Sequence, residues 1–331
     1  FSPEIYNTEN GEIKPIKVEY REEKTIIRYR IFGYDSILLK LVYGKTDYEK
    51  AQYIPGKSSE MLCEMCDYEL SEENILVLDM AQWKIDDDKD YFPKEEVLRL
   101  DNLIRKRLGM DERGGSVVQS WVLGKLPKDH RATLKFTFNS EIDYEGAILA
   151  LEDADVAEVT FNGKKITERE EGFYVDISIG RMKLGNIIKG ENILEITLPF
   201  GETANLENVF VLGNFGVKVT SSIAVITELP EKISFGSLLY QGFPFYSGAV
   251  TYKIMTKAEN GSLTVTASDY MGALVEVIVD GEIKGDIIYP PYTLEIKGVP
   301  NGEHEIGLKL YTHRYNSFGP IHLVDVNEKW L

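Results

Sequence analysis

Acidic residues are the most numerous candidates for chemistry in this chain, which has 54 aspartates and glutamates among 331 residues. Glycoside hydrolysis needs two carboxyl groups about 5 to 10 Å apart across a sugar-sized cleft. Two sets of acids supply suitable groups close together in the sequence: Glu168, Glu170 and Glu171, and Glu141 with Asp143. Both sets lie in hydrophilic segments, so the sequence favours solvated surface charge here and predicts no catalytic residue.

A second acidic motif, Asp86-Asp-Asp-Lys-Asp90, places carboxylates at Asp86, Asp88 and Asp90. Oxygen ligands at alternate positions suit a hard cation such as calcium. The later glycine and the final glutamate of an EF-hand loop are missing. An acidic turn between a strand ending at Ile85 and a helix explains the motif equally well. A structural calcium ion and an unligated turn therefore both stay open, and we predict no other cofactor.

The last third of the chain is rich in aromatic residues near polar groups. Sugars stack their apolar CH faces on aromatic rings, and neighbouring polar side chains bind their hydroxyls. The candidate carbohydrate-binding residues are Tyr246, Tyr289, Tyr292, Arg314, Tyr315 and Asn316. The alternative is core packing, because aromatic residues beside proline and glycine commonly plug the ends of β-sandwiches.

The two cysteines, Cys63 and Cys66, form a single CxxC motif. A zinc site needs four ligands, and no second pair of cysteines or histidines lies nearby in the sequence. We therefore interpret both as ordinary thiols. Without a disulfide framework, the cellular compartment stays open.

The composition limits the partners. A net charge of −17 disfavours nucleic acid and anionic membranes, whereas neutral partners such as carbohydrate fit an acidic surface. No stretch approaches the roughly 18 apolar residues of a membrane span. The chain begins with Phe1, not Met, so we expect it to be a piece of a longer polypeptide.

The elements that would position these residues are strands, and their order is repeated. Residues 147–151, 158–163, 174–177 and 190–198 recur in order as residues 263–267, 276–281, 292–296 and 302–310. Each copy alternates polar and apolar residues and contains a two-residue hairpin, Asn162-Gly163 or Asp280-Gly281. The repeat predicts two consecutive β-sandwiches.

One amphipathic helix is predicted over residues 93–108, with Pro93 at its first position, Glu95 and Glu96 in its first turn, and Gly109 at its end. The predicted fold is therefore mainly β. A partial β-sheet domain (residues 1–70) that completes an upstream unit precedes one sandwich with the helix (71–225) and a second sandwich (226–331).

Several motifs carry a resemblance to known proteins. They are Arg99-Leu-Asp-Asn-Leu-Ile-Arg105, Gln119-Ser-Trp121, Leu198-Pro-Phe-Gly201, Gln241-Gly-Phe-Pro-Phe-Tyr-Ser-Gly248 and Tyr289-Pro-Pro-Tyr-Thr-Leu294. With the two hairpins, they resemble the C-terminal galactose-binding-like (jelly-roll) domains of large bacterial glycoside hydrolases of the family 2 or α-L-rhamnosidase type. The resemblance covers roughly residues 70–331. It implies tandem sugar-binding-type sandwiches, which often carry a calcium ion, and catalytic carboxylates in a barrel upstream of Phe1.

Three functions follow as hypotheses. The first is a non-catalytic accessory region of a glycoside hydrolase, whose partners are the upstream catalytic domain of the same polypeptide and carbohydrate. The second is a pair of carbohydrate-binding modules with an aromatic platform in the last domain. The third, a complete small enzyme, would require two carboxylates in a deep pocket.

Overall fold

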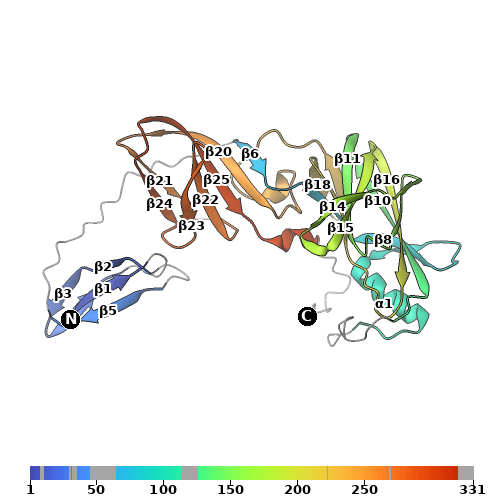
Figure 1. Ribbon diagram of the computed structural model, residues 1–331, viewed down its shortest axis with the longest axis horizontal. Helices are drawn as coiled ribbons and strands as arrows, with labels where there is room; N and C mark the ends of the chain where they lie inside the picture. The colour runs from blue at the N-terminus through green and yellow to red at the C-terminus, as the bar shows by residue number, and fades with distance from the viewer. Residues whose placement is uncertain are drawn as a thin grey trace. The chain divides into compact units, whose positions relative to one another are not determined.

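The computed structural model describes residues 1–7, 11–29, 31, 36–44, 65–113, 126–221, 223–267 and 270–319. Cys63 and the motif at residues 119–121 lie outside these ranges. The described chain is mainly β, as predicted (Figure 1). It divides into two compact units. Unit 1 comprises residues 1–64 and 254–309, and unit 2 comprises residues 65–253 and 310–331. The domain limits near residues 70 and 225 stay predictions.

Unit 2 contains a sandwich of two sheets. The first sheet has the order β13-β12-β16-β10-β19-β18, with β8 paired to β10 and β9 paired to β8. Its strands are β8 (Met80–Ile85), β9 (Phe92–Glu96), β10 (His130–Ser140), β12 (Glu158–Phe161), β13 (Lys164–Ile166), β16 (Gly190–Phe200), β18 (Gly216–Thr220) and β19 (Ile223–Thr227).

The second sheet of unit 2 has the order β14-β15-β11-β17-β7. Its strands are β7 (Asn74–Leu78), β11 (Tyr144–Glu152), β14 (Arg169–Tyr174), β15 (Asp176–Ile187) and β17 (Val209–Gly213). β7 and β17 are buried throughout, so their side chains are apolar almost without interruption.

Alternation of side chains explains why the two sheets share one core. Along β10, Leu134, Phe136 and Phe138 point inward and are buried, and Leu194 and Ile196 do the same on its partner β16. Successive side chains of a strand face opposite sides of the sheet. Burying each such side chain contributes about 1.5–3 kcal/mol, so the sandwich is held by its own core.

The helix, α1 (Val97–Leu108), begins four residues later than predicted. The segment containing Pro93 forms β9 instead, where Glu96 lies opposite Met80 of β8. Glu96 also caps the helix, because its carboxylate accepts the first free backbone N–H groups. The predicted C-terminal end is confirmed, with Gly109 in the left-handed conformation (φ 71°).

Both predicted hairpins are confirmed. Asn162 and Gly163 have φ values of 46° and 77° and join β12 to β13. Asp280 and Gly281, with φ values of 49° and 82°, join β22 (Leu274–Val279) to β23 (Glu282–Ile287). Two positive φ values in succession define the turn that matches the twist of paired strands, and Asn-Gly and Asp-Gly adopt it most readily.

Unit 1 holds the second copy of the repeat. Its strands run in the order β23-β22-β25-β20, with β21 (Ser262–Thr266) paired to β24 (Thr293–Lys297). The division between the units falls within β20 (Ala249–Ala258) and β25 (Gly302–Tyr311).

The described residues among the first 44 form two small sheets. β1 (Ser2–Tyr6) lies between β2 (Ile13–Pro15) and β5 (Leu38–Val42), and β3 (Val18–Arg21) pairs with β4 (Lys24–Ile27). The alternation of polar and apolar residues predicts three strands there, at residues 16–20, 25–31 and 36–42. The difference arises because short strands such as β2 show too few residues for a periodic pattern.

Three short elements complete unit 2. β6 (Asp67–Leu70) pairs with the first half of β20. Two single turns of 3₁₀ helix follow later in the chain: η1 (Leu238–Tyr240) and η2 (Arg314–Phe318).

Candidate functional site

Unit 2 contains an open groove with a volume of about 720 Å³. β6 and the turn that follows it form one wall, and the segment at residues 229–231 forms the other. The lining residues are Tyr68, Leu70, Ser71, Glu72, Glu73, Asn214, Leu229, Pro230 and Glu231. We refer to this feature as the unit 2 groove. Its volume lies within the range of ligand pockets, about 300–1,000 Å³.

The groove opens where a strand pairing stops. Cys66 and Ile233 exchange two backbone hydrogen bonds, of 2.8 and 3.1 Å, and the buried Cys66 thiol also donates to the Ile233 carbonyl. Farther along, the Tyr68 hydroxyl donates to the Pro230 carbonyl at 2.5 Å. Burial raises the pKa of Tyr68, so the hydroxyl stays protonated and able to donate. This contact spans the two walls.

Two arginines pair with the carboxylates of the groove. Glu72 binds Arg314 in a two-point contact with one N–O distance of 3.0 Å, and Glu73 binds Arg181 at 2.8 Å. Arg181 also contacts Glu170 at 3.2 Å. The hydrogen bond from Arg181 lowers the pKa of Glu73 despite its partial burial. Glu73 is therefore ionised at neutral pH and accepts hydrogen bonds.

Two predicted carbohydrate-binding residues adjoin this groove. Arg314 reaches it through Glu72, and Tyr246 reaches it through Ser71, whose backbone N–H donates to the Tyr246 hydroxyl at 3.0 Å. The Tyr246 hydroxyl in turn donates to Ala249 O at 2.8 Å. Because the ring of Tyr246 is only 1% exposed, a sugar cannot stack on it. Tyr246 supports the groove wall.

The remaining predicted residues of unit 2 lie on η2. Tyr315 is 66% exposed and its ring meets His313 edge-on, whereas Asn316 is half-buried. η2 is attached to the sandwich by Thr312, whose hydroxyl donates to Gly248 O at 2.9 Å, and by Asn208, which donates to Phe318 O at 3.1 Å. Tyr315 therefore offers an exposed ring on an anchored segment.

Tyr289 and Tyr292 belong to unit 1, where a cis peptide bond joins Pro290 to Pro291. Tyr289 is 58% exposed. Tyr292 is half-buried and meets the ring of Tyr270 edge-on, with 5.9 Å between the ring centres. These tyrosines present aromatic surface on one loop, and sugar binding by them stays a prediction.

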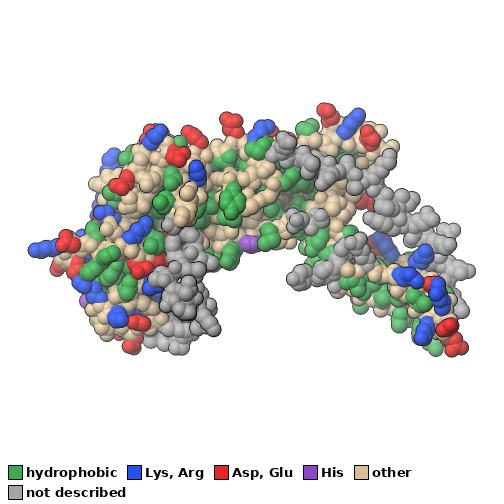
Figure 2. All heavy atoms as spheres, turned by 180° about the vertical axis from the view of Figure 1, so that it is seen from behind, with side chains coloured by type: hydrophobic (Ala, Val, Ile, Leu, Met, Phe, Trp, Pro, Cys, Tyr) green, Lys and Arg blue, Asp and Glu red, His purple; other side chains and the backbone are tan. Residues whose placement is uncertain are grey.

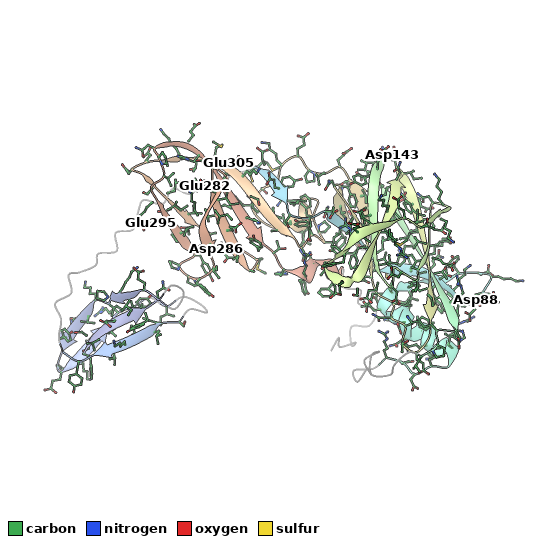
Figure 3. The ribbon with its side chains drawn as sticks, in the orientation of Figure 1. Asp88, Asp143, Glu282, Asp286, Glu295 and Glu305 are labelled. Atoms are coloured by element: carbon green, nitrogen blue, oxygen red, sulfur yellow. The ribbon has the colours of Figure 1, made fainter. Side chains whose placement is uncertain are left out.

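The three aspartates proposed for calcium have different surroundings. Asp86 accepts the Arg131 backbone N–H at 2.8 Å and contacts His130, and Asp88 binds Arg107 at 2.9 Å. Asp88 is labelled in Figure 3, on the turn between β8 and β9. Among the residues that the structure describes, no group of three acidic, histidine or cysteine side chains is arranged to hold a metal ion. Calcium at Asp86, Asp88 and Asp90 stays a prediction.

Glu168 and Asp143, from the two other sets of candidate carboxylates, bind neighbouring groups. Glu168 pairs with Lys183, and Asp143, labelled in Figure 3, accepts the Lys189 backbone N–H at 2.8 Å. Sequence reasoning missed Glu207, the one carboxyl group in the described ranges whose pKa is clearly raised, chiefly by burial. The cavity beside Glu207 measures only about 10 Å³, which is about the volume that one water needs.

The described surface has mixed charge. Acidic and basic side chains are interspersed on the face seen in Figure 2. No helix in the described part of the chain is long and apolar enough to cross a membrane.

Comparisons with known proteins found no matching family model and no matching curated protein. Among solved structures, the chain is similar to a GH2 β-galacturonidase from Eisenbergiella tayi (10% identity, 74% of this chain, 38% of that one, TM-score 0.27). It is also similar to a β-D-mannosidase from Dictyoglomus thermophilum (15%, 72%, 31%, 0.29) and a rhamnosidase from Novosphingobium sp. PP1Y (16%, 65%, 22%, 0.22). The chain spans less than two fifths of each of these proteins. Such low scores do not establish a shared fold or function.

Proposed function

We propose that this chain is a non-catalytic β-sandwich region of a glycoside hydrolase, which supports the catalytic domain of the same polypeptide and contacts carbohydrate through exposed side chains. One observation carries the non-catalytic part. The carboxylates Glu72 and Glu73 in the unit 2 groove are paired with arginines. A glycosidase needs one carboxyl group that stays protonated until it donates its proton to the leaving group. An arginine partner favours the ionised carboxylate instead.

The pKa of Glu207 is shifted in the direction that a general acid needs, but the site does not meet the spatial requirement. Its pKa is raised, yet the adjoining cavity of about 10 Å³ has no room for a sugar ring. A carboxyl group that is buried among core residues such as Leu134 and Leu198 has a structural explanation for its raised pKa. Within the described ranges, the groove with room for a sugar and the carboxyl group with the raised pKa are therefore in different places.

The link to glycoside hydrolases rests on the sequence resemblance. The motif at residues 99–105 lies on α1, the motif at 198–201 ends β16, and the motif at 289–294 holds the two tyrosines of unit 1. These segments lie in units that are mainly β, as the sequence predicts. Fold alone does not fix function, so the parent activity and its substrate remain part of the proposal.

A second candidate function is a true carbohydrate-binding module. The exposure of Tyr289 and Tyr315 favours it, because an accessible ring is the first requirement for sugar stacking. In Arg314, the guanidinium is already bound to Glu72, and such a pair can orient hydroxyl groups by donating and accepting at once.

A hydrolysis assay combined with a glycan array tests the proposal. The chain is incubated with a panel of aryl glycosides and then screened on the array, with every hit measured by calorimetry. We expect no hydrolysis and weak binding, with Kd in the millimolar range. Hydrolysis that survives repurification would contradict the proposal.

Two variants separate the two candidates. Tyr289→Ala with Tyr292→Ala removes the rings of the unit 1 loop, and Tyr240→Ala serves as a matched control because Tyr240 is 91% exposed on η1, outside the candidate site. Tight, saturable binding that only the double variant loses would replace the accessory role by the binding-module role.

A further inference from the structure

We propose that the unit 2 groove is a docking slot for an extended peptide segment carrying lysine or arginine, which adds as a β-strand along the open edge of β6. The proposal concerns a partner protein or a segment of one, and it goes beyond the accessory role in a hydrolase.

The pairing of β6 with β20 determines which backbone groups face the groove. The Ser71 backbone N–H donates to Ala249 O at 3.0 Å, and in the same register Glu69 lies opposite Thr251. In an antiparallel ladder, hydrogen-bonded residues alternate with residues whose N–H and C=O point to the other side. The odd-numbered residues of β6 therefore face β20, and the backbone groups of Tyr68 and Leu70 face the opposite edge.

The edge of β6 that faces away from β20 borders the unit 2 groove. The pairing of Cys66 with Ile233 would continue as Tyr68 with Glu231 and Leu70 with Leu229 if the two segments stayed together. These four residues line the groove instead. In the described chain, no backbone hydrogen bond joins them. The ladder thus opens after one bridge and leaves a gap beside a strand edge.

The local sequence explains why the ladder opens. Pro230 stands between the two residues that would pair with Tyr68 and Leu70, and its ring fixes φ at about −65°, well away from the value of a regular antiparallel strand. The Pro230 carbonyl already accepts a hydrogen bond from the Tyr68 hydroxyl. An open strand edge is a template for another chain, and peptides bind such edges through main-chain hydrogen bonds.

Glu231, the one acidic side chain of the groove that has no arginine partner among the described residues, favours a basic occupant. Glu72, Glu73 and Glu231 line the groove, and the two nearby arginines are already bound to the first two of these acids. Glu231 is exposed. Together with the net charge of −17, this favours a segment with basic side chains, whereas Leu70, Leu229 and Pro230 accept an apolar side chain between them.

A peptide fits this edge better than a sugar does. β6 has four residues, which extend over about 13 Å at the rise of a strand. An extended peptide repeats its N–H and C=O groups at the same spacing as Tyr68 and Leu70. A sugar has no such repeat, and the Tyr68 ring is half-buried and packs edge-on against Phe243, with 5.6 Å between ring centres.

The test uses a fluorescein-labelled peptide, acetylated and amidated, of the sequence Lys-Val-Lys-Val-Lys-Val-Lys, and measures its binding by fluorescence anisotropy. We expect saturable binding. Two control peptides separate the causes: one is N-methylated at alternate residues, which removes backbone donors but keeps the charge, and one has glutamate in place of lysine. Each control should bind about tenfold more weakly or worse. Equal binding by the N-methylated peptide would overturn strand pairing.

A matched pair of variants locates the site. Glu231→Lys should weaken binding of the basic peptide about tenfold, whereas Glu228→Lys, an exposed position of the same segment that does not line the groove, should not. Both positions are exposed, so neither change disturbs the core. Equal losses in the two variants would show attraction to the general surface charge and overturn the proposal.

Hydrogen exchange of individual backbone amides tests strand pairing directly, because attraction between charges alone would not protect particular amides. Bound peptide should slow the exchange of the Tyr68 and Leu70 amides and leave that of Glu69, which already faces β20, unchanged. Unaltered exchange at Tyr68 and Leu70 would overturn the proposal. So would displacement of the peptide by a neutral oligosaccharide such as β-1,4-galactotetraose, which would make the groove a carbohydrate site.

Discussion

The buried ion pair between Asp101 and Arg105 on α1 is expected to be the most costly polar contact to break in unit 2. The two residues are only 3% and 4% exposed, and they pair directly. Arg105 also donates to Ala204 O at 2.9 Å and Glu202 O at 3.2 Å, and Asp101 accepts Leu206 N at 3.2 Å. The pair therefore fixes α1 to the loop after β16.

The magnitude follows from what each change leaves behind. Arg105→Met leaves a buried carboxylate without its main partner and should lower the free energy of unfolding by about 3–5 kcal/mol. Asp101→Leu leaves a buried guanidinium and should cost about the same. The double variant removes both charges of the pair, and the partly exposed Arg113, which also contacts Asp101 at 3.6 Å, keeps its hydrogen bond to Ala204 O. Glu202 O and Leu206 N lose these partners, at about 1 kcal/mol each, or about 2 kcal/mol in all.

The assay is equilibrium unfolding in guanidinium chloride, followed by tryptophan fluorescence, to which Trp83 contributes. This residue is buried beside α1, with its ring stacked on Phe92. Arg107→Met is the matched control, because Arg107 pairs with Asp88 at the surface and such pairs contribute about 1 kcal/mol or less. The double variant should be several kcal/mol more stable than the sum of the two single changes implies. Losses that add within about 0.5 kcal/mol would refute the reasoning.

Two further predictions concern pH. The Asp280 carboxylate raises the pKa of His304 above 6.5, so the stability from this pair is present in full below pH 6.5 and is lost as pH rises through the raised value. The Tm of unit 1, followed by circular dichroism, should therefore fall as pH rises in the native chain. A similar slope in the His304→Asn variant would contradict this. Burial raises the pKa of Glu207 above 4.5, so its charge destabilises unit 2 at neutral pH. The Glu207→Gln variant should therefore have a higher Tm than the native chain at pH 7 but not at pH 4. An unchanged or lower Tm of the variant at pH 7 would argue against this explanation.

The parts of the fold that were predictable are those with local causes. The turns at Asn162-Gly163 and Asp280-Gly281 follow from backbone preferences of two adjacent residues, and the end of α1 follows from Gly109. The start of α1 was wrong because the segment after Phe92 satisfies both a helix start and a strand, and pairing with β8 decides between them. That pairing is a tertiary contact, which local sequence does not specify.

The unit 2 groove was not predictable for the same reason. Its walls come from β6, from Asn214 and from residues 229–231, and no local motif connects them. Arg314 and Glu72, which meet at its rim, are 242 residues apart in the sequence. Residue type drew attention to Arg314, and its role in sugar binding stays a prediction. For Tyr246 it indicated an aromatic ring but not its burial, which depends on the register of β20 and β6.

The repeated sequence encodes a repeated structural corner. In unit 2, the Asn162 backbone N–H donates to Ile193 O on the long strand at 2.9 Å. The Asn162 side chain accepts from Ile193 N at 2.8 Å and donates to Asn192 Oδ1 at 2.9 Å. In unit 1, Asp280 makes the same contacts, with its backbone N–H on Glu305 O, its carboxylate on Glu305 N at 3.0 Å, and His304 at 2.6 Å.

The equivalence explains why two turns so far apart carry similar residues. In each unit, a turn residue with a positive φ holds the strand that begins at Gly190 or Gly302, so the side chains at both corners are occupied by internal contacts. Only the unit 1 version contains a titratable pair. The side chains that the two repeats share at these corners hold the hairpins. Ligand binding is therefore to be sought in other features: the unit 2 groove, η2 and the loop at Tyr289.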